Sequence, residues 1–358
     1  MVLDDRDKEA KYPKRQKPTN QREEARKVAT PTAPATPKRA ARPAANAREE
    51  VEKWCKTCLD KGVTGLRDEF AREIKRYVPA DMQFEAFKVN HPAGRNRYQD
   101  VPCQDKGRII LKPPAPCDYI HANYVATPMS DKRFICTQGP LDNTLIDFWH
   151  MIIQEETDSI IMLCNVIEKG LLKCAQYWPN DVNTSVKPSD NIEVVNVEQR
   201  MMMADDQSIR LCVLKMKWDF GTPQEREVRH YQWIDWPDRG VPVIKGHTPT
   251  ELLSRVRGTK KPIVVHCSAG IGRTGTIVAI EYTLERLLIG LPTLDMDKLL
   301  KEVRDQRPYT IQNDAQYLYI HRVLLNYFIV KYKHEGLRAK DVMEKYDRFV
   351  VDYEKATA

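Results

Sequence analysis

The chain has 358 residues, 42% hydrophobic and 30% charged, with a formal net charge of +7, which is typical of a globular protein and excludes a fibrous or wholly disordered one. Its apolar runs, such as SIIMLCNVI at 159–167, are far shorter than the ~18 residues that a membrane helix needs. The polar first residues do not form a secretory signal, so the sequence predicts a cytoplasmic protein without a transmembrane segment.

Residues 1–47 are predicted to be a disordered basic tail rich in Pro and Ala. Residues 1–50 hold 13 Lys/Arg against 8 Asp/Glu, a net charge of +5, and residues 1–46 contain few large apolar side chains. Such a composition cannot bury enough surface to offset the entropy of ordering. The tail is either a solvated leader or a segment that touches nucleic acid or anionic lipid. We expect the solvated leader and no nucleic-acid partner.

The next segment is predicted to form two helices. Residues 48–62 (REEVEKWCKTCLDKG) predict a helix that ends at Gly62, and residues 65–79 repeat apolar side chains at helical spacing up to a proline. The first helix contains Cys55-x-x-Cys58, but no second cysteine pair or histidine cluster lies nearby. We therefore interpret the two cysteines as core residues rather than a zinc or redox site. The nine cysteines of the chain have no regular spacing and predict no disulfide framework.

Short β-rich runs separated by turns occupy most of residues 95–265. Seven of these runs are candidate strands: 108–112, 133–138, 159–164, 191–203, 208–218, 226–234 and 261–267. Candidate helices lie at 143–156, 273–290, 294–307 and 313–332. The order of elements predicts an α/β fold: a single domain over residues 48–334, with a highly twisted mixed β-sheet flanked by α-helices.

Residues 335–358 form a separate C-terminal extension in this prediction. Val342, Tyr346, Phe349 and Tyr353 fall on one helical face of this segment. The amphipathic helix either binds a partner or packs on the domain.

The stretch VVHCSAGIGRTG at 264–275 predicts an anion-binding loop between a strand and a helix. Loop amides and a helix N-terminus then point at one spot, where they bind a phosphate-sized dianion. Glycines in the loop permit positive φ and a close approach of the backbone to the anion. The loop residues that would surround the anion are Ser268, Ala269, Gly270, Ile271 and Gly272.

The residues at the ends of this loop indicate chemistry as well as binding. A nucleotide-binding loop would carry Lys and Ser/Thr after its last glycine, whereas here Arg273 follows. A guanidinium clamps two phosphate oxygens at once. Cys267 opens the loop, and a thiol at a helix N-terminus beside an arginine is readily ionised. The pair predicts nucleophilic attack on phosphorus through a phosphocysteine, with no metal or cofactor. The alternative for Cys267 is a buried structural cysteine.

Such a transfer needs a proton donor for the leaving oxygen and a base for the attacking water. Trp236-Pro237-Asp238 lies in a loop with Gly240 close by, and Asp238 is the candidate for both roles.

Several motifs in fixed order resemble the cysteine-dependent, phosphotyrosine-specific protein tyrosine phosphatases. They are NRYQDV, DYIHANYV, FICTQGPLDNT, DFWHMI, EKGLLKCAQYWP, WIDWPDRGVP, HCSAGIGRTG and IQNDAQY, over roughly residues 60–330. The pattern looks most like compact single-domain, non-receptor members of the kind expanded in nematodes. The resemblance implies a signalling enzyme that is expected to be a monomer acting on phosphotyrosine-containing proteins.

The resemblance also implies a role for each matching residue. Cys267 would be the nucleophile, Arg273 the phosphate clamp and Asp238 the general acid. Thr274 would ease departure of the thiolate in the second step.

Further positions match the family around this centre. His266 would favour the thiolate, with Tyr177 as its hydrogen-bond partner. Gln312 and Gln316 match the pair that positions the hydrolytic water.

Substrate binding is implied for another group of positions. Glu168 would hold Arg273 in place, and Lys173 would contact the acid loop. Tyr98 would stack on the phosphotyrosine ring as one wall of a deep slot, unless it is only a packed aromatic at a strand edge. Asp100 would accept hydrogen bonds from the peptide backbone.

Three positions depart from the family pattern. His121 stands where Asn is usual and is expected to alter a structural hydrogen bond, and Asn313 replaces a common Thr. Tyr309 stands where Gly is usual, and we expect it to border the pocket mouth and restrict access. Two other functions stay open: a pseudophosphatase that binds phosphotyrosine proteins without turnover, and a dual-specificity or phosphoinositide phosphatase.

Overall fold

The computed structural model describes residues 45–244 and 246–358, which belong to one compact unit. Residues 1–44 of the predicted tail lie outside the described residues. Helix α1 (Ala45–Glu69) is broken at Gly62, where φ is 60° and ψ is −177°, and continues into the π-helical turn η1 (Phe70–Ile74). The predicted end of the first helix at Gly62 is therefore confirmed as a break, because only glycine adopts that conformation without strain.

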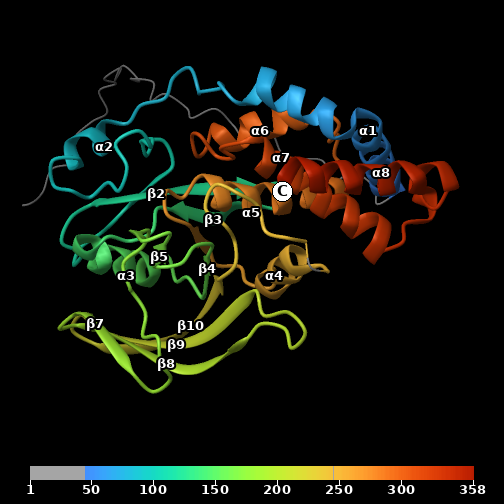
Figure 1. Ribbon diagram of the computed structural model, residues 1–358. Coiled ribbons are helices and arrows are strands. Elements are labelled where there is room, and N and C mark those ends of the chain that lie inside the picture. Colours follow the sequence, from blue (N-terminus) through green and yellow to red (C-terminus); the bar gives the residue numbers. More distant parts are fainter. Residues whose placement is uncertain (1–44, 245) are drawn as a thin grey trace, which may run out of the picture. The chain divides into compact units, whose positions relative to one another are not determined.

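A mixed sheet forms the centre of the unit, as predicted (Figure 1). Among the described residues it has nine strands in the order β1-β2-β3-β11-β4-β10-β9-β8-β7. The strands are β1 (Arg108–Ile110), β2 (Tyr119–Thr127), β3 (Ser130–Thr137), β4 (Ser159–Met162), β7 (Ser185–Ser189), β8 (Ile192–Met201), β9 (Ile209–Asp219), β10 (Pro223–Trp233) and β11 (Ile263–His266). Strand β11 is parallel to both neighbours, β3 and β4, whereas the outer strands pair mostly antiparallel.

Helices cover both faces of the sheet. They are α2 (Glu85–Asn90), α3 (Leu145–Gln154), α4 (Thr248–Val256), α5 (Gly272–Leu288), α6 (Met296–Arg304), α7 (Asp314–Leu325) and α8 (Lys340–Thr357). Short turns η2 (Asp142–Thr144), η3 (Asn326–Lys331) and η4 (Glu335–Leu337) join them. Helices α1, α6, α7 and α8 gather on one side of β2 and β3, and α3 lies on the other (Figure 1). In the described part of the chain, no helix is both long enough and apolar enough to cross a membrane.

Helix α5 is the central helix of the unit. Its side chains are buried almost all round, because it lies between the sheet and α7. A helix enclosed on every side needs no single apolar face. Its position fixes its N-terminus at the carboxyl end of β11, between the ends of β3 and β4.

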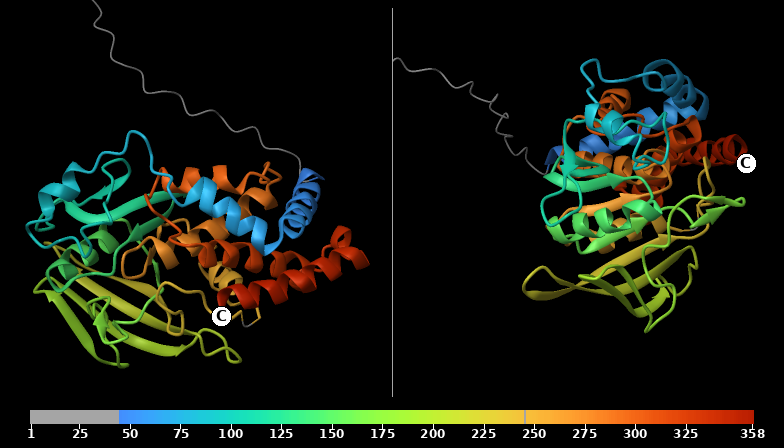
Figure 2. Two further views of the ribbon diagram at one scale, coloured as in Figure 1. Left: turned by 45° about the horizontal axis from the view of Figure 1, so that its top comes forward. Right: turned by 90° about the vertical axis from the view of Figure 1, so that its left-hand side faces the viewer.

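Helix α8 packs on α1 and α7 at the end of the chain (Figure 2). Its apolar residues Val342, Tyr346, Phe349 and Tyr353 are buried. Arg322 of α7 donates a hydrogen bond to the Tyr346 hydroxyl at 2.9 Å. This chain therefore covers the apolar face of α8 itself, which leaves little of that face for a partner.

Cys55 and Cys58 lie in the core beneath α1, both almost fully buried. Burial raises the pKa of both thiols. Their location agrees with the interpretation as core residues.

A buried arginine ties the sheet to the segment before α7. Arg307 is fully buried and donates to Asn123 Oδ1 at 2.8 Å, His121 Nδ1 at 3.1 Å and the Gly270 carbonyl at 3.2 Å. Because a guanidinium has no acceptor, His121 Nδ1 must accept, and its Nε2–H then donates to the Val101 carbonyl at 2.8 Å. His121 thus makes two hydrogen bonds in the core, one with Arg307 and one with the Val101 carbonyl. These are the local contacts that we expected to differ at this position.

The His121 imidazole should make the fold sensitive to acid. Burial, with the charge of Arg307, lowers the pKa of His121 from 6.5 to about 3. Below pH 6.5 the His121 side chain binds a proton in the unfolded chain but stays neutral in the folded protein. Its contribution to the free energy of unfolding is therefore complete above pH 6.5 and is lost as the pH falls toward 3. His121→Gln removes the titration. In urea unfolding at pH 7 and pH 5, the wild type should lose about 2 kcal/mol more than the variant. An equal loss in both proteins would contradict this assignment.

Candidate active site

The loop between β11 and α5 holds a sulfur atom under a backbone amide. Cys267 is 4% exposed, and the Gly270 N–H donates to its Sγ at 3.2 Å. Helix α5 begins at Gly272, directly after the loop. A hydrogen-bond donor and a helix N-terminus at the sulfur both stabilise negative charge there. The local sequence thus forms the predicted loop between a strand and a helix N-terminus, and anion binding there stays a prediction.

Gly270 is required by the close packing of this loop. Its φ is 71°, and a Cβ atom there would lie 2.1 Å from the Thr137 carbonyl oxygen at the end of β3. Any side chain would push the loop away from β3 and move the amide that faces Cys267. The glycine therefore positions the sulfur-binding amide.

Arg273 stands in the first turn of α5, almost completely buried. Glu168 accepts from its Nη1 at 2.6 Å and its Nη2 at 2.9 Å, and the Trp236 carbonyl accepts from Nη1 at 3.2 Å. Burial opposes the charge, but the hydrogen bonds to Glu168 outweigh it and raise the pKa of Arg273. The structure thus brings Glu168 and Arg273 together as the resemblance implied, in the planar two-point geometry typical of such pairs.

The predicted acid loop lies against the same guanidinium. Asp238 accepts from Lys173 Nζ at 2.8 Å and from Arg273 Nη2 at 3.3 Å. Trp236 Nε1 closes the loop by donating to the Gly240 carbonyl at 3.1 Å. Lys173 contacts the acid loop as expected.

Asn313 also holds this loop, although the sequence comparison gave it no role. Its Nδ2 donates to the Arg239 carbonyl at 2.7 Å, and its Oδ1 accepts from the Gln316 N–H at 2.9 Å as the N-cap of α7. One side chain therefore joins the acid loop to α7.

Two cations decide the protonation of Asp238. Partial burial alone would raise its pKa, but the hydrogen bond from Lys173 and the charge of Arg273 outweigh burial and lower the pKa below its usual range. In the ligand-free protein Asp238 is therefore a carboxylate. A dianion bound at Arg273 would weaken this stabilisation and raise the pKa of Asp238 again.

These residues enclose a slot of about 410 Å³. Its lining comprises Tyr98, Asp100, Val101, Leu171, Leu172, Lys173, Asp238, Arg239, Cys267, Ser268, Ala269, Arg273, Gln312 and Gln316. Cys267, Arg273 and Gln316 are almost completely buried and form the floor, whereas Asp100 and Gln312 are exposed at the rim. The arrangement can hold an oxyanion at the sulfur with an organic group above it.

Tyr98 forms a wall of the slot and is tied to the loop. The Ser268 hydroxyl donates to the Lys173 carbonyl at 3.1 Å, so its oxygen accepts from the Tyr98 hydroxyl at 2.8 Å. Tyr98 lies outside the strands, which argues against the strand-edge alternative.

His266 lies beneath the slot in a buried chain of hydrogen bonds. Tyr177 bonds His266 Nε2 at 2.7 Å, as expected, and also His230 Nε2 at 2.7 Å. His266 Nδ1 faces the Cys267 carbonyl at 3.2 Å, and because a carbonyl oxygen only accepts, Nδ1 carries a proton in this hydrogen bond. No pattern in the sequence indicated a role for His230, which looks like an ordinary residue of β10.

Two polar groups near the floor have no partner among the described residues. Gln316 accepts from the Gln312 N–H at 2.8 Å, but its Nε2 is buried and unpaired in this part of the chain. The same holds for Thr274 Oγ1 in the first turn of α5. Buried polar groups of this kind are ordinarily satisfied, so they suit a water molecule or ligand oxygen.

The structure also separates some residues from the slot. Gly270, Ile271, Gly272 and Thr274 belong to the buried loop and helix behind its lining. Tyr309 has a φ of 62° and is not among the lining residues, so the expected narrowing of the mouth is not seen.

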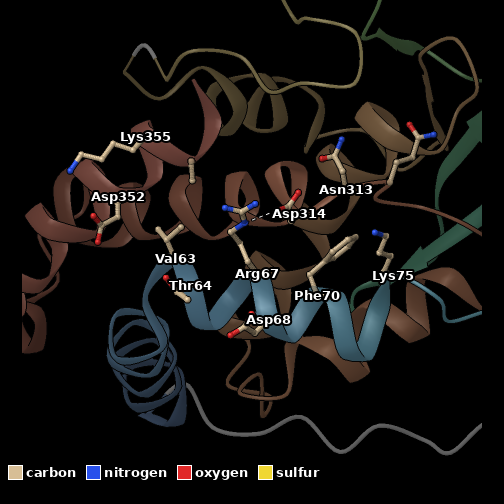
Figure 3. A pocket seen from close by; sticks show the side chains of 13 residues that line it. Val63, Thr64, Arg67, Asp68, Phe70, Lys75, Asn313, Asp314, Asp352 and Lys355 are labelled. Atoms are coloured by element: carbon tan, nitrogen blue, oxygen red, sulfur yellow. Dashed lines mark hydrogen bonds and ion pairs between the residues drawn. The ribbon is translucent and has the colours of Figure 1, made fainter.

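A second cavity, of about 850 Å³, lies between α1, α8 and the start of α7 (Figure 3). Arg67 and Asp314 pair there at 2.6 Å, and Lys355 and Asp352 of α8 stand at its other end. It shares Gln312 with the slot but contains no cysteine or histidine.

Comparisons with known proteins agree with the geometry. The family model described as protein-tyrosine phosphatase matches residues 92–326, more than half of the chain. Tyrosine-protein phosphatase Lar-like of Caenorhabditis elegans is 37% identical over 243 residues, covering 65% of this chain and 10% of that protein. Human receptor-type tyrosine-protein phosphatase zeta is 33% identical over 276 residues, covering 74% of this chain and 12% of that protein. The chain thus spans about a tenth of the length of these curated relatives.

Solved structures give the same result. The catalytic domain of human protein tyrosine phosphatase non-receptor type 18 is 27% identical, with a TM-score of 0.66, and the match covers 79% of this chain and 99% of that one. PTPN18 in complex with HER2 phosphopeptides is 28% identical, with a TM-score of 0.70 and the same coverage.

Glu168→Gln should weaken oxyanion binding because the neutral amide no longer holds Arg273 at two points. We expect the Kd for inorganic phosphate, measured by calorimetry, to rise about tenfold, since hydrogen bonds to charged groups contribute more than neutral ones. Glu281→Gln is a matched control, because Glu281 pairs with Arg257 in the same two-point way at 2.9 and 2.7 Å. Equal phosphate affinity in the two variants would refute the positioning role of Glu168.

Proposed function

Because the chain belongs to the protein-tyrosine phosphatase family, we propose that it hydrolyses phosphotyrosine in proteins through a phosphocysteine on Cys267. The observation that supports the proposal most is the position of the Cys267 sulfur at the floor of the slot. The sulfur accepts a hydrogen bond from the Gly270 N–H, and Arg273 lines the same slot. Residues 48–334 are proposed as the catalytic domain.

In the first step the Cys267 thiolate attacks phosphorus. The S–P bond forms, the P–O bond to the tyrosine ring breaks, and Asp238 gives its proton to the leaving phenolate. Arg273 and the loop amides hold the phosphoryl oxygens, where charge is stabilised best by preorganised donors.

The protonation of Asp238 is set by the substrate. In the free protein Lys173 and Arg273 keep it ionised. A phosphate dianion competes for Arg273 and repels the carboxylate, so binding raises the pKa of Asp238 and favours the acid that the first step needs. Activity should accordingly be highest at mildly acidic pH.

In the second step water attacks the phosphocysteine. Asp238, now a carboxylate, takes a proton from the water, the S–P bond breaks, and phosphate leaves. The unpaired Gln316 amide beside Gln312 is suited to orient that water. Thr274 Oγ1, which has no hydrogen-bond partner among the residues that the structure describes, would stabilise the departing thiolate.

The depth of the slot accounts for the choice of phosphotyrosine. Tyr98 stands half-buried along the wall between the exposed rim and the buried sulfur. A phenyl ring spans that depth and stacks on Tyr98, whereas phosphoserine is too short. Asp100 at the rim is placed to accept from the peptide backbone.

The cytoplasmic, non-receptor, monomeric character predicted from the sequence remains part of the proposal. Both curated relatives are far longer than this chain, and the human one is receptor-type.

Cys267→Ser should abolish turnover while retaining phosphopeptide binding, because the hydroxyl is a poor nucleophile but keeps the shape of the loop. Phosphate release and fluorescence polarisation with a labelled phosphotyrosine peptide measure the two properties. Residual turnover in the variant would argue against a phosphocysteine. A wild type that binds the peptide without releasing phosphate would be a binding module.

Asp238→Ala should lower kcat on a phosphotyrosine peptide by about 10²–10⁴, the usual contribution of general acid–base catalysis. The loss should be smaller on p-nitrophenyl phosphate, whose leaving group needs less protonation. Steady-state kinetics on both substrates test this, and equal losses on both would exclude Asp238 as the acid for the leaving group.

A further inference from the structure

A small hairpin beside the slot exposes an unusual amount of apolar surface. It consists of β5 (Ile167–Glu168) and β6 (Leu171–Leu172). Ile167 and Leu171 are each 62% exposed and Leu172 is 53% exposed, so every strand residue except Glu168 is an exposed aliphatic. Single exposed aliphatics are ordinary, but a cluster beside a cavity indicates a binding surface.

The register of the hairpin assigns these residues to two faces. Leu171 lies opposite Glu168, and Leu172 lies opposite Ile167. Residues that face each other across antiparallel strands share a side of the sheet. Glu168 turns toward Arg273, so Leu171 lies on the side of the slot, and Ile167 lies on the outer side. Of the hairpin aliphatics, Leu171 and Leu172 belong to the slot lining and Ile167 does not.

Leu171 and Leu172 are the two exposed apolar side chains of the slot lining, and Leu171 is the one on the Glu168 face of the hairpin. Asp100, Arg239 and Gln312 are the exposed polar residues of the lining. A peptide whose phosphotyrosine reaches Cys267 at the floor must cross this rim, so its neighbouring side chains meet either these polar groups or the two leucines, of which Leu171 is the more exposed.

The hairpin is held rigidly before any ligand binds. The Asn165 N–H donates to Glu168 Oε1 at 3.0 Å, and the Lys173 N–H donates to the Val166 carbonyl at 2.8 Å. Contacts that are ordered in advance lose little entropy on binding. When a substrate side chain packs on Leu171, most of the favourable free energy of apolar burial is therefore retained.

We propose that Leu171 is a specificity-determining residue that binds a large aliphatic side chain flanking phosphotyrosine in the substrate. The inference rests on the proposed function, since it concerns the peptide that enters the same slot. The hairpin thus directs the protein toward phosphotyrosine sites with Leu, Ile or Met beside them.

Matched phosphotyrosine peptides test this preference. Each carries Leu or Ser at one position within two residues of the phosphotyrosine, on either side, in an otherwise constant sequence. For wild type, the best Leu peptide should have a kcat/KM about tenfold above its Ser partner, the scale on which apolar subsites discriminate. In Leu171→Ser this ratio should fall to within twofold of one.

Ile167→Ser is the matched control, because it removes an equally exposed aliphatic from the other face of the same hairpin. It should keep the tenfold ratio and the wild-type rate on p-nitrophenyl phosphate. If wild type shows no ratio at any position, or if Leu171→Ser keeps it, the inference is overturned. Loss of the ratio in both variants would also overturn it, because the hairpin as a whole would then be responsible.

A binding assay separates this inference from the proposed function. The same peptides with a non-hydrolysable phosphonate in place of the phosphate give Kd values without turnover. An inactive wild type that still prefers the Leu phosphonate peptide through Leu171 would refute the phosphatase and retain the subsite. An active wild type with equal Kd and kcat/KM for the Leu and Ser peptides would support the phosphatase and refute the subsite.

Discussion

The buried pair between Arg273 and Glu168 is the contact on which the rest of the site depends. A buried guanidinium destabilises the fold unless its charge is compensated. The Glu168 carboxylate compensates it by accepting hydrogen bonds from two of its nitrogens. The pair joins the first turn of α5 to the β5–β6 hairpin, and Arg273 also holds Trp236 and Asp238 of the acid loop. Nucleophile loop, acid loop and slot rim thus meet at one side chain.

The same guanidinium links substrate binding to the proton that catalysis needs. Asp238 and a bound phosphate would compete for Arg273. In the ligand-free protein the acid loop therefore lies beside the site with Asp238 ionised. An arriving dianion displaces that interaction and makes the neutral acid more favourable. In the proposed mechanism no separate signal is required to protonate Asp238, because the charge of the substrate favours its neutral form. The parallel strands β3, β11 and β4 supply the frame, because their carboxyl ends meet at the proposed ligand site.

How far the site could be predicted depended on how local its determinants are. Cys267 and Arg273 lie only six residues apart in the sequence, at the two ends of one loop, so their spacing alone indicated the chemistry. His230 and Asn313 act through contacts with residues that are distant in sequence, His266 and Arg239, and no local pattern marks them. The sheet shows the same difference. Strand β11 read clearly as a buried apolar run, whereas Tyr119–Thr127, which is β2, was not among the candidate strands because His121 and Asn123 interrupt its apolar pattern.

Those two residues also explain why a polar strand can lie in the core. His121 and Asn123 both accept hydrogen bonds from Arg307, which in turn bonds the carbonyl of Gly270 in the nucleophile loop. A buried polar network is stable only when every member is satisfied, and here the loop itself supplies an acceptor. The strand, the arginine and the loop therefore specify one another. The β5–β6 hairpin is different, since its inner carboxylate is fixed by Arg273 while Leu171 beside it stays exposed. A substitution at Leu171 would therefore test the proposed subsite without removing the contact between Glu168 and Arg273.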